Sequence, residues 1–148
     1  MGLSIGLATG VYGLSFGAVS VGSGLSIGQT VALSALMFTG GSQFALAGVI
    51  GGGGSYPAAV AAASLLGVRN GVYGLGLNSL LRPPNRLKPL YAQLTIDEST
   101  ATASAQETPD EQKRGFWAAA LGVYFFWNLS TLIGAVLGSA IDRSEEHT

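Results

Sequence analysis

The chain has 148 residues, of which 10% are charged and 48% are hydrophobic, and its formal net charge is −1. No Asp, Glu, Lys or Arg precedes Arg69, whereas soluble domains carry about 25% charged residues. These figures exclude a soluble enzyme, a nucleic-acid-binding protein and a disordered chain, and they predict an all-α protein that crosses a membrane several times.

Two rare residue types exclude further kinds of site. The chain has no Cys, and its single His is residue 147, so we expect no disulfide, no metal site and no Ser-His pair. The small net charge indicates no polyanionic partner. We therefore expect no cofactor, no enzymatic activity and no nucleic-acid partner.

The first half of the chain contains two predicted spans. About 20 apolar residues cross a hydrocarbon core of about 30 Å, and residues 3–23 and 29–50 each meet this length. Residues 24–28 form a short predicted turn between them. Four consecutive glycines at 51–54 predict the clearest loop of the chain.

The second half contains two more predicted spans. The third covers residues 58–81, and the Arg-Pro-Pro-Asn-Arg sequence at 82–86 ends it because two prolines cannot continue a helix. Residues 87–105 predict an interfacial helix, a re-entrant half-helix or a short span. Residues 107–114 predict a polar loop, and residues 116–141 predict the final span. The expected fold is all-α and polytopic, with about four transmembrane helices and one interfacial or re-entrant helix.

Pairs of glycines recur at a spacing of four residues. In lipid this spacing lets helix backbones approach closely. The pairs are Gly6/Gly10, Gly13/Gly17, Gly24/Gly28 and Gly134/Gly138. They are candidate helix–helix contacts.

The middle of the second predicted span contains a candidate binding motif, formed by Gly40, Gly41, Ser42, Gln43 and Phe44. Two adjacent glycines weaken a helix, and the backbone groups freed by a broken transmembrane helix bind zwitterionic substrates in transporters. The alternative is a kinked, tightly packed helix with Gln43 hydrogen-bonded across helices. Both interpretations stay open from the residues alone.

Arg69 is a charge near the middle of the third predicted span. A charge at this depth costs roughly 2.5–3.5 kcal/mol on insertion scales, so it requires a partner or a wet cavity. A substrate carboxylate or a nearby acid, Asp97 or Glu98, would serve. The alternative is that the span is shorter and Arg69 snorkels from its end. Asn70 beside it is a candidate to bond backbone or ligand.

Asp97 and Glu98 follow a moderately apolar stretch. Acidic residues in membrane segments often mark ion or proton paths, so this pair is a candidate for coupling or for an ion pair with Arg69. They also fit a helix start, because Thr95 as N-cap with Glu98 three residues later forms a capping box.

Residues 143–148, Arg-Ser-Glu-Glu-His-Thr, change the composition abruptly. Read as the codons AGA TCG GAA GAG CAC ACG, these residues match the start of a common sequencing-library adapter. We expect residues 1–142 to be a partial membrane domain and residues 143–148 to be an adapter scar, which fold reasoning leaves aside. A polar cytoplasmic tail is the alternative.

Six short sequence motifs follow one another along the chain, and their order and spacing are characteristic. They are YGLSFGA at 12–18, GLS at 24–26, MFTGGSQF at 37–44, LGVRNGVY at 66–73, LTIDES at 94–99 and WNLSTLIG at 127–134. In this order and spacing the chain resembles AzlC-type branched-chain amino acid permeases over residues 3–142. Members of the family typically have an Asn-Leu-Arg-His-like sequence at 67–70. The Arg matches Arg69, whereas Asn70 stands where the family has His.

The resemblance implies a function and partners. It implies secondary transport, as export, of branched-chain amino acids such as valine across the bacterial inner membrane. It also implies a small multi-spanning partner subunit of the AzlD type. A channel for small zwitterions and a non-transporting assembly subunit are the alternatives, although one mid-span Arg and a broken helix fit a carrier better.

Overall fold

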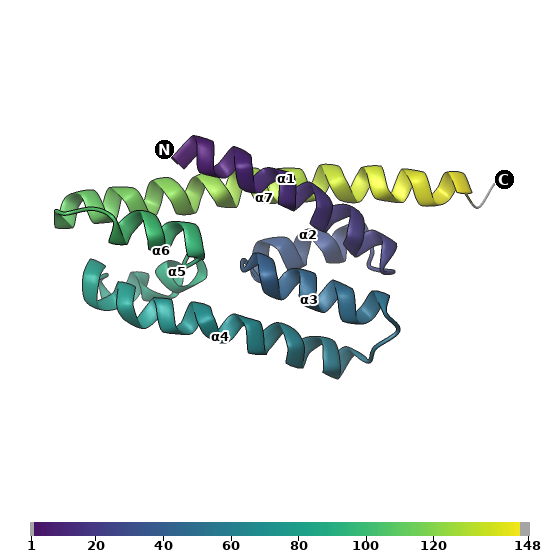
Figure 1. Ribbon diagram of the computed structural model, residues 1–148, viewed down its shortest axis with the longest axis horizontal. Helices are drawn as coiled ribbons and strands as arrows, with labels where there is room; N and C mark the ends of the chain where they lie inside the picture. Colours follow the sequence, from purple (N-terminus) through teal and green to yellow (C-terminus); the bar gives the residue numbers. More distant parts are fainter. Residues whose placement is uncertain (1, 146–148) are drawn as a thin grey trace.

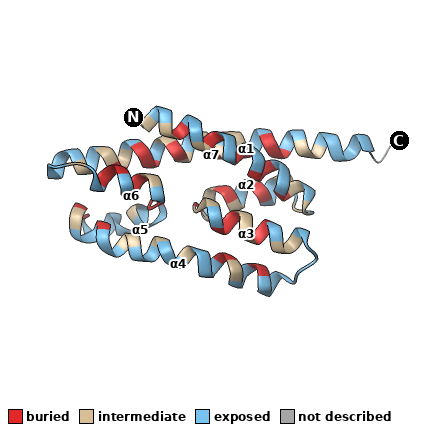
Figure 2. Cartoon of the chain, viewed as in Figure 1, coloured by how far each residue is buried: buried red, intermediate tan, exposed pale blue. Residues whose placement is uncertain are grey.

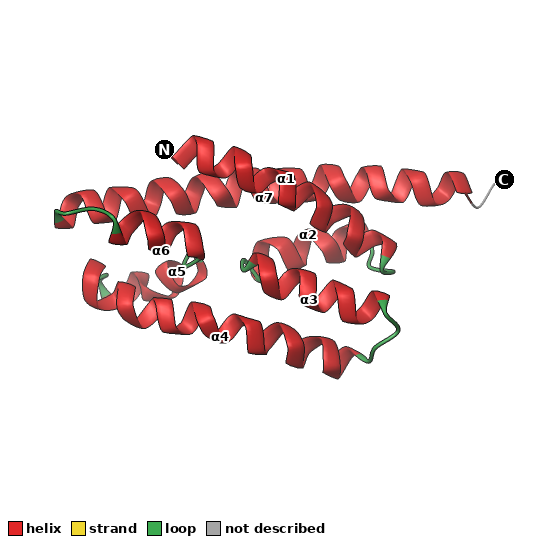
Figure 3. Cartoon of the chain, viewed as in Figure 1, coloured by secondary structure: helices red, strands yellow, loops and turns green. Residues whose placement is uncertain are grey.

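The computed structural model describes residues 2–145 and confirms the all-α fold. No strand occurs among these residues, and short loops join the helices (Figure 3). Residues 146–148 of the predicted adapter scar lie outside the described residues, whereas residues 143–145 continue the last helix.

Three helices of the described chain are long and apolar enough to cross a membrane. They are α1 (Gly2–Gly22), α4 (Tyr56–Leu81) and α7 (Pro109–Glu145). Only 11% of the most apolar stretch of α4 is buried, and Figure 2 shows exposed residues along most of this helix. An apolar helix with so little buried surface fits contact with lipid.

The remaining helices are short and lie between the long ones. They are α2 (Ile27–Leu36), α3 (Gly40–Gly51), the 3-10 helix η1 (Asn85–Leu87), α5 (Lys88–Gln93) and α6 (Asp97–Ser104). Figure 1 shows α1 and α7 on one side and α4 on the other, with α2 and α3 in one group and α5 and α6 in another. Residues 87–105 are therefore several short pieces between the long helices.

The predicted span over residues 29–50 is discontinuous, as the broken-helix interpretation of the motif at 40–44 predicts. This segment is two helices, α2 and α3, separated at residues 37–39. Thr39 has an extended φ of −148°, which no helix continues through. The two glycines therefore begin α3, and the pair α2 and α3 stands where the sequence predicts the second span.

The prediction of a polar loop over residues 107–114 is wrong, because α7 begins at Pro109. The Glu111 carboxylate accepts hydrogen bonds from the backbone N–H of Thr108 at 3.3 Å and from its hydroxyl. The Thr108 hydroxyl in turn accepts from the backbone N–H of Glu111 at 3.4 Å. This capping box, with Pro in the first turn, starts the helix in polar sequence.

The helices α1 and α7 lie side by side (Figure 1), and glycines make their approach possible. A Cβ atom on Gly17 would clash with the backbone of Thr131 and Ala135, and one on Gly134 would clash with the backbone of Leu14. Three of the four predicted glycine pairs lie in this contact. The pair at 24 and 28 does not, because a Cβ there would meet no other helix.

We expect Gly17→Ala to lower the free energy of unfolding by about 1–3 kcal/mol, because the added methyl group overpacks the contact between α1 and α7. Thermal unfolding of the detergent-solubilised protein, followed by circular dichroism, measures the change. Gly76→Ala on α4 is the control, since a Cβ there meets no atom within 4 Å. Equal melting temperatures of the two variants would contradict the close approach.

Candidate functional site

A cavity of about 280 Å³ lies where the start of α3 faces the start of α6. Side chains and backbone from α1, α3, α4, α6 and α7, together with the break before α3, line it. The lining residues are Thr9, Tyr12, Phe38, Thr39, Gly40, Gly41, Phe44, Arg69, Asn70, Ile96, Asp97, Glu98, Val123 and Trp127. Seven of the nine residues singled out from the sequence are in this set; Ser42 and Gln43 are not.

One side of the cavity is charged. Arg69 lies near the middle of α4, and its Nη2 is 3.1 Å from Asp97 Oδ2 on α6. The two side chains keep exposed fractions of 53% and 48%, so each has free surface toward the cavity. Asn70 binds backbone: its Nδ2 donates a hydrogen bond to the carbonyl oxygen of Thr95 at 3.0 Å.

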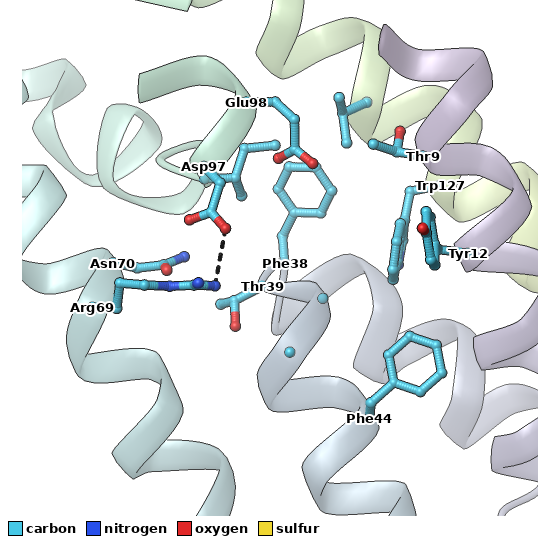
Figure 4. A pocket seen from close by; sticks show the side chains of 14 residues that line it. Thr9, Tyr12, Phe38, Thr39, Phe44, Arg69, Asn70, Asp97, Glu98 and Trp127 are labelled. Atoms are coloured by element: carbon cyan, nitrogen blue, oxygen red, sulfur yellow. Dashed lines mark ion pairs between the residues drawn. The ribbon is translucent and has the colours of Figure 1, made fainter. Parts of the chain in front are cut away.

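The opposite side of the cavity is aromatic. In Figure 4, Trp127, Tyr12 and Phe44 lie across from Arg69 and Asp97. The Trp127 ring stacks on Phe16 with ring centroids 6.3 Å apart and meets Phe44 edge-on at 6.5 Å. The cavity therefore has a charged end and an apolar end.

Gln43 does not line the cavity, and its side chain is fully buried. Its Nε2 donates to the carbonyl oxygens of Ser34, at 3.2 Å, and Met37. Its Oε1 accepts a hydrogen bond from Trp127 Nε1 at 2.9 Å. Gln43 therefore bonds across helices, as one of the two interpretations of the motif predicts. Ser42 is also buried, and its hydroxyl has no hydrogen-bond partner.

The other carbonyl groups at the end of α2 are bonded as well. The Gln93 side chain of α5 donates to the carbonyl oxygens of Ala35 and Leu36 at 2.9 and 3.0 Å. The Tyr124 hydroxyl of α7 also donates to Ala35, at 3.4 Å. The last carbonyls of a helix have no partner within it, so side chains from three other helices complete the broken end of α2.

The capping box predicted for Thr95 and Glu98 is wrong. Thr95 donates its hydroxyl to the carbonyl oxygen of Tyr91 at 2.7 Å. Ser99 makes the hydrogen bond at the start of α6, because its Oγ accepts from the backbone N–H of Ile96 at 3.0 Å. The Glu98 carboxyl is thereby free of this role and lies at the cavity (Figure 4).

The Glu98 carboxyl titrates abnormally. Glu98 lies on α6, outside the three long helices. Burial raises the pKa of its carboxyl above the ordinary value, and the neighbouring Asp97 adds to this, whereas a backbone hydrogen bond and Arg69 act in the opposite direction. Glu98 therefore keeps its proton to a higher pH than a carboxyl in water.

Sequence reasoning missed most of the apolar lining. Thr9 and Tyr12 of α1, Val123 of α7 and Phe38 in the break carry no chemical signal that separates them from packing residues. Trp127 of α7 also forms one wall of the cavity. No cluster of three or more potential metal ligands occurs among residues 2–145.

Comparison with known proteins identifies the family. The family model described as AzlC protein matches residues 4–141, which is nearly the whole chain. No curated protein and no solved structure matches. The chain therefore belongs to the AzlC family, a transporter-type family of membrane proteins related to branched-chain amino acid transport.

Proposed function

We propose that this protein exports branched-chain amino acids such as valine across the bacterial inner membrane by secondary transport. The cavity between Arg69 and Trp127 is the proposed binding site. The observation that carries the proposal is the Arg69–Asp97 ion pair, because it lies half exposed at one end of a cavity whose other end is apolar.

The size of the cavity supports a small substrate. Pockets for drug-sized ligands measure about 300–1,000 Å³, and this cavity measures about 280 Å³. A single amino acid suits such a volume better than a peptide or a nucleotide. The apolar end, with Phe44, Val123 and Trp127, suits an aliphatic side chain.

The charges of the cavity suit a zwitterion. Arg69 presents N–H donors to a carboxylate, and Asp97 and Glu98 present acceptors to an ammonium group. The helix α3 begins at the cavity with Gly40, and the first N–H groups of a helix have no partner within it. A substrate carboxylate near Arg69 and these N–H groups would place the aliphatic side chain toward Trp127.

The broken helix supports a carrier with a partner rather than a channel. Transporter sites are commonly built from discontinuous helices near the middle of the membrane, and α2 and α3 form such a pair at the cavity. A small AzlD-type subunit is the proposed partner, and the lipid bilayer is the proposed surrounding of α4. Membership of the AzlC family supports both export and this partner.

Arg69→Ala is expected to abolish protection against toxic dipeptides that contain valine or leucine. Cells that express the full-length protein with its AzlD-type partner should survive these dipeptides better than cells without them. Loss of the guanidinium removes the group that binds the substrate carboxylate. Colony survival, measured at equal membrane abundance of each variant, reports the effect.

The matched control is Arg86→Ala, which removes the same charge from η1, outside the cavity. It should leave protection unchanged. Equal survival with and without the wild-type protein would reject branched-chain export and favour the assembly-subunit alternative. Protection that persists in Arg69→Ala would reject the assigned site.

Glu98→Gln and Asp97→Asn are expected to remove the pH dependence of transport. The Glu98 carboxyl, with its raised pKa, takes up a proton as the pH falls toward that value and releases it as the pH rises, whereas an amide does neither, and Asp97→Asn removes the charge beside it. Valine uptake into inverted vesicles, measured across the pH range above the ordinary carboxyl pKa, tests this. Glu107→Gln, in the loop before α7, is the control. Unchanged pH dependence in both cavity variants would exclude these carboxyls as the coupling groups.

A further inference from the structure

We propose that the Trp127 ring determines which substrate side chains the cavity accepts, and that Gln43 is the positioning residue that holds this ring. This inference rests on the proposed function and deepens it. It assigns the site to short aliphatic side chains and makes it exclude aromatic ones.

Trp127 is placed to limit the cavity. It stands opposite the charged end (Figure 4) and has an exposed fraction of only 7%. Phe16, itself fully buried, lies behind its face, and Phe44 lies against it edge-on. A ring with packed neighbours on these sides cannot move aside easily, because protein interiors are close-packed. A longer substrate side chain would meet this ring.

The hydrogen bond from Trp127 fixes how the ring is turned. Its Nε1 donates to Gln43 Oε1 at 2.9 Å. The amide of Gln43 is held in turn, because its Nε2 donates to the carbonyl oxygens of Ser34 and Met37 at the end of α2. One buried amide therefore joins the break between α2 and α3 to the wall of the cavity.

Gly40, together with Gln43 and the packed aromatic rings, determines where the Trp127 ring lies. A Cβ atom on Gly40 would lie 3.1 Å from Trp127 Cη2, so the ring would have to shift by a few tenths of an ångström. The absence of a side chain at the start of α3 therefore lets the indole lie where it does. Two residues of the motif at 40–44, Gly40 and Gln43, therefore determine the position of Trp127, which lies more than eighty residues later in the sequence.

The experiment measures selectivity. The full-length protein with its AzlD-type partner is reconstituted in liposomes, and exchange of radiolabelled valine is inhibited by unlabelled valine or by unlabelled phenylalanine. The ratio of the two inhibitory concentrations is the selectivity. This ratio does not depend on how much active protein each preparation contains, so a partly unstable variant still gives an answer.

Trp127→Phe should lower the selectivity for valine over phenylalanine about tenfold, the lower end of what a small volume change in an apolar pocket produces. Gly40→Ala should also change the ratio, because it displaces the ring. Gly48→Ala, in the same helix with no atom within 4 Å of an added Cβ, should leave it unchanged.

Gln43→Met should lower the selectivity in the same direction as Trp127→Phe, because the ring loses its hydrogen bond. In the Trp127→Phe background it should add no further change, since residues that act through one group are non-additive. Full additivity of the two changes would overturn the positioning role of Gln43.

Two failures are distinguishable. Wild-type protein that exchanges valine, with an unchanged ratio in both Trp127→Phe and Gly40→Ala, overturns the inference and leaves the proposed function standing. Wild-type protein that exchanges no aliphatic amino acid contradicts the proposed function and the inference together.

Discussion

The end of α2 is the constraint on which the rest of the structure depends. The last carbonyl groups of a helix have no partners within it, and lipid offers them no hydrogen-bond donors. Here the side chains of Gln43, Gln93 and Tyr124 supply the missing donors. These side chains come from α3, α5 and α7, so the hydrogen bonds at the break tie the end of α2 to three other helices. The interruption between α2 and α3 also contributes Phe38, Thr39 and Gly40 to the lining of the cavity.

The long helices carry the residues at the two ends of the cavity. The glycine contact between α1 and α7 fixes where Tyr12 and Trp127 lie, while α4 carries Arg69 on the opposite side. The short helix α6 then brings Asp97 to Arg69. An apolar wall and a charged wall are therefore built from different elements, and the space between them depends on how the short helices pack.

Much of the fold could be predicted from the sequence, because apolar length and the absence of charge are strong signals. The three long helices and the weak point at Gly40 and Gly41 follow from composition and helix propensity alone. The early start of α7 could have been found from the Thr108–Glu111 capping pair, which polar composition obscured. The sequence favours Thr95 as the cap of α6 because Thr is a common N-cap residue, whereas in the structure Ser99 bonds the backbone of the apolar Ile96 one position later.

Less of the site could be predicted from the sequence. The opposite charges of Arg69 and Asp97 suggest that the two residues pair, but the sequence does not give the rotation of each helix about its axis. This rotation decides that Trp127 lines the cavity and that Gln43 does not.

The contact between α1 and α7 also affects how the protein is made. These are the first and last helices of the described chain, and α1 leaves its glycine face open until its partner is synthesised. At roughly 5–20 residues per second, the segment between them takes on the order of ten seconds to translate. During that interval α1 is not yet in contact with α7. Biogenesis therefore includes a stage in which the small-residue surface of α1 contacts lipid or the insertion machinery in place of α7.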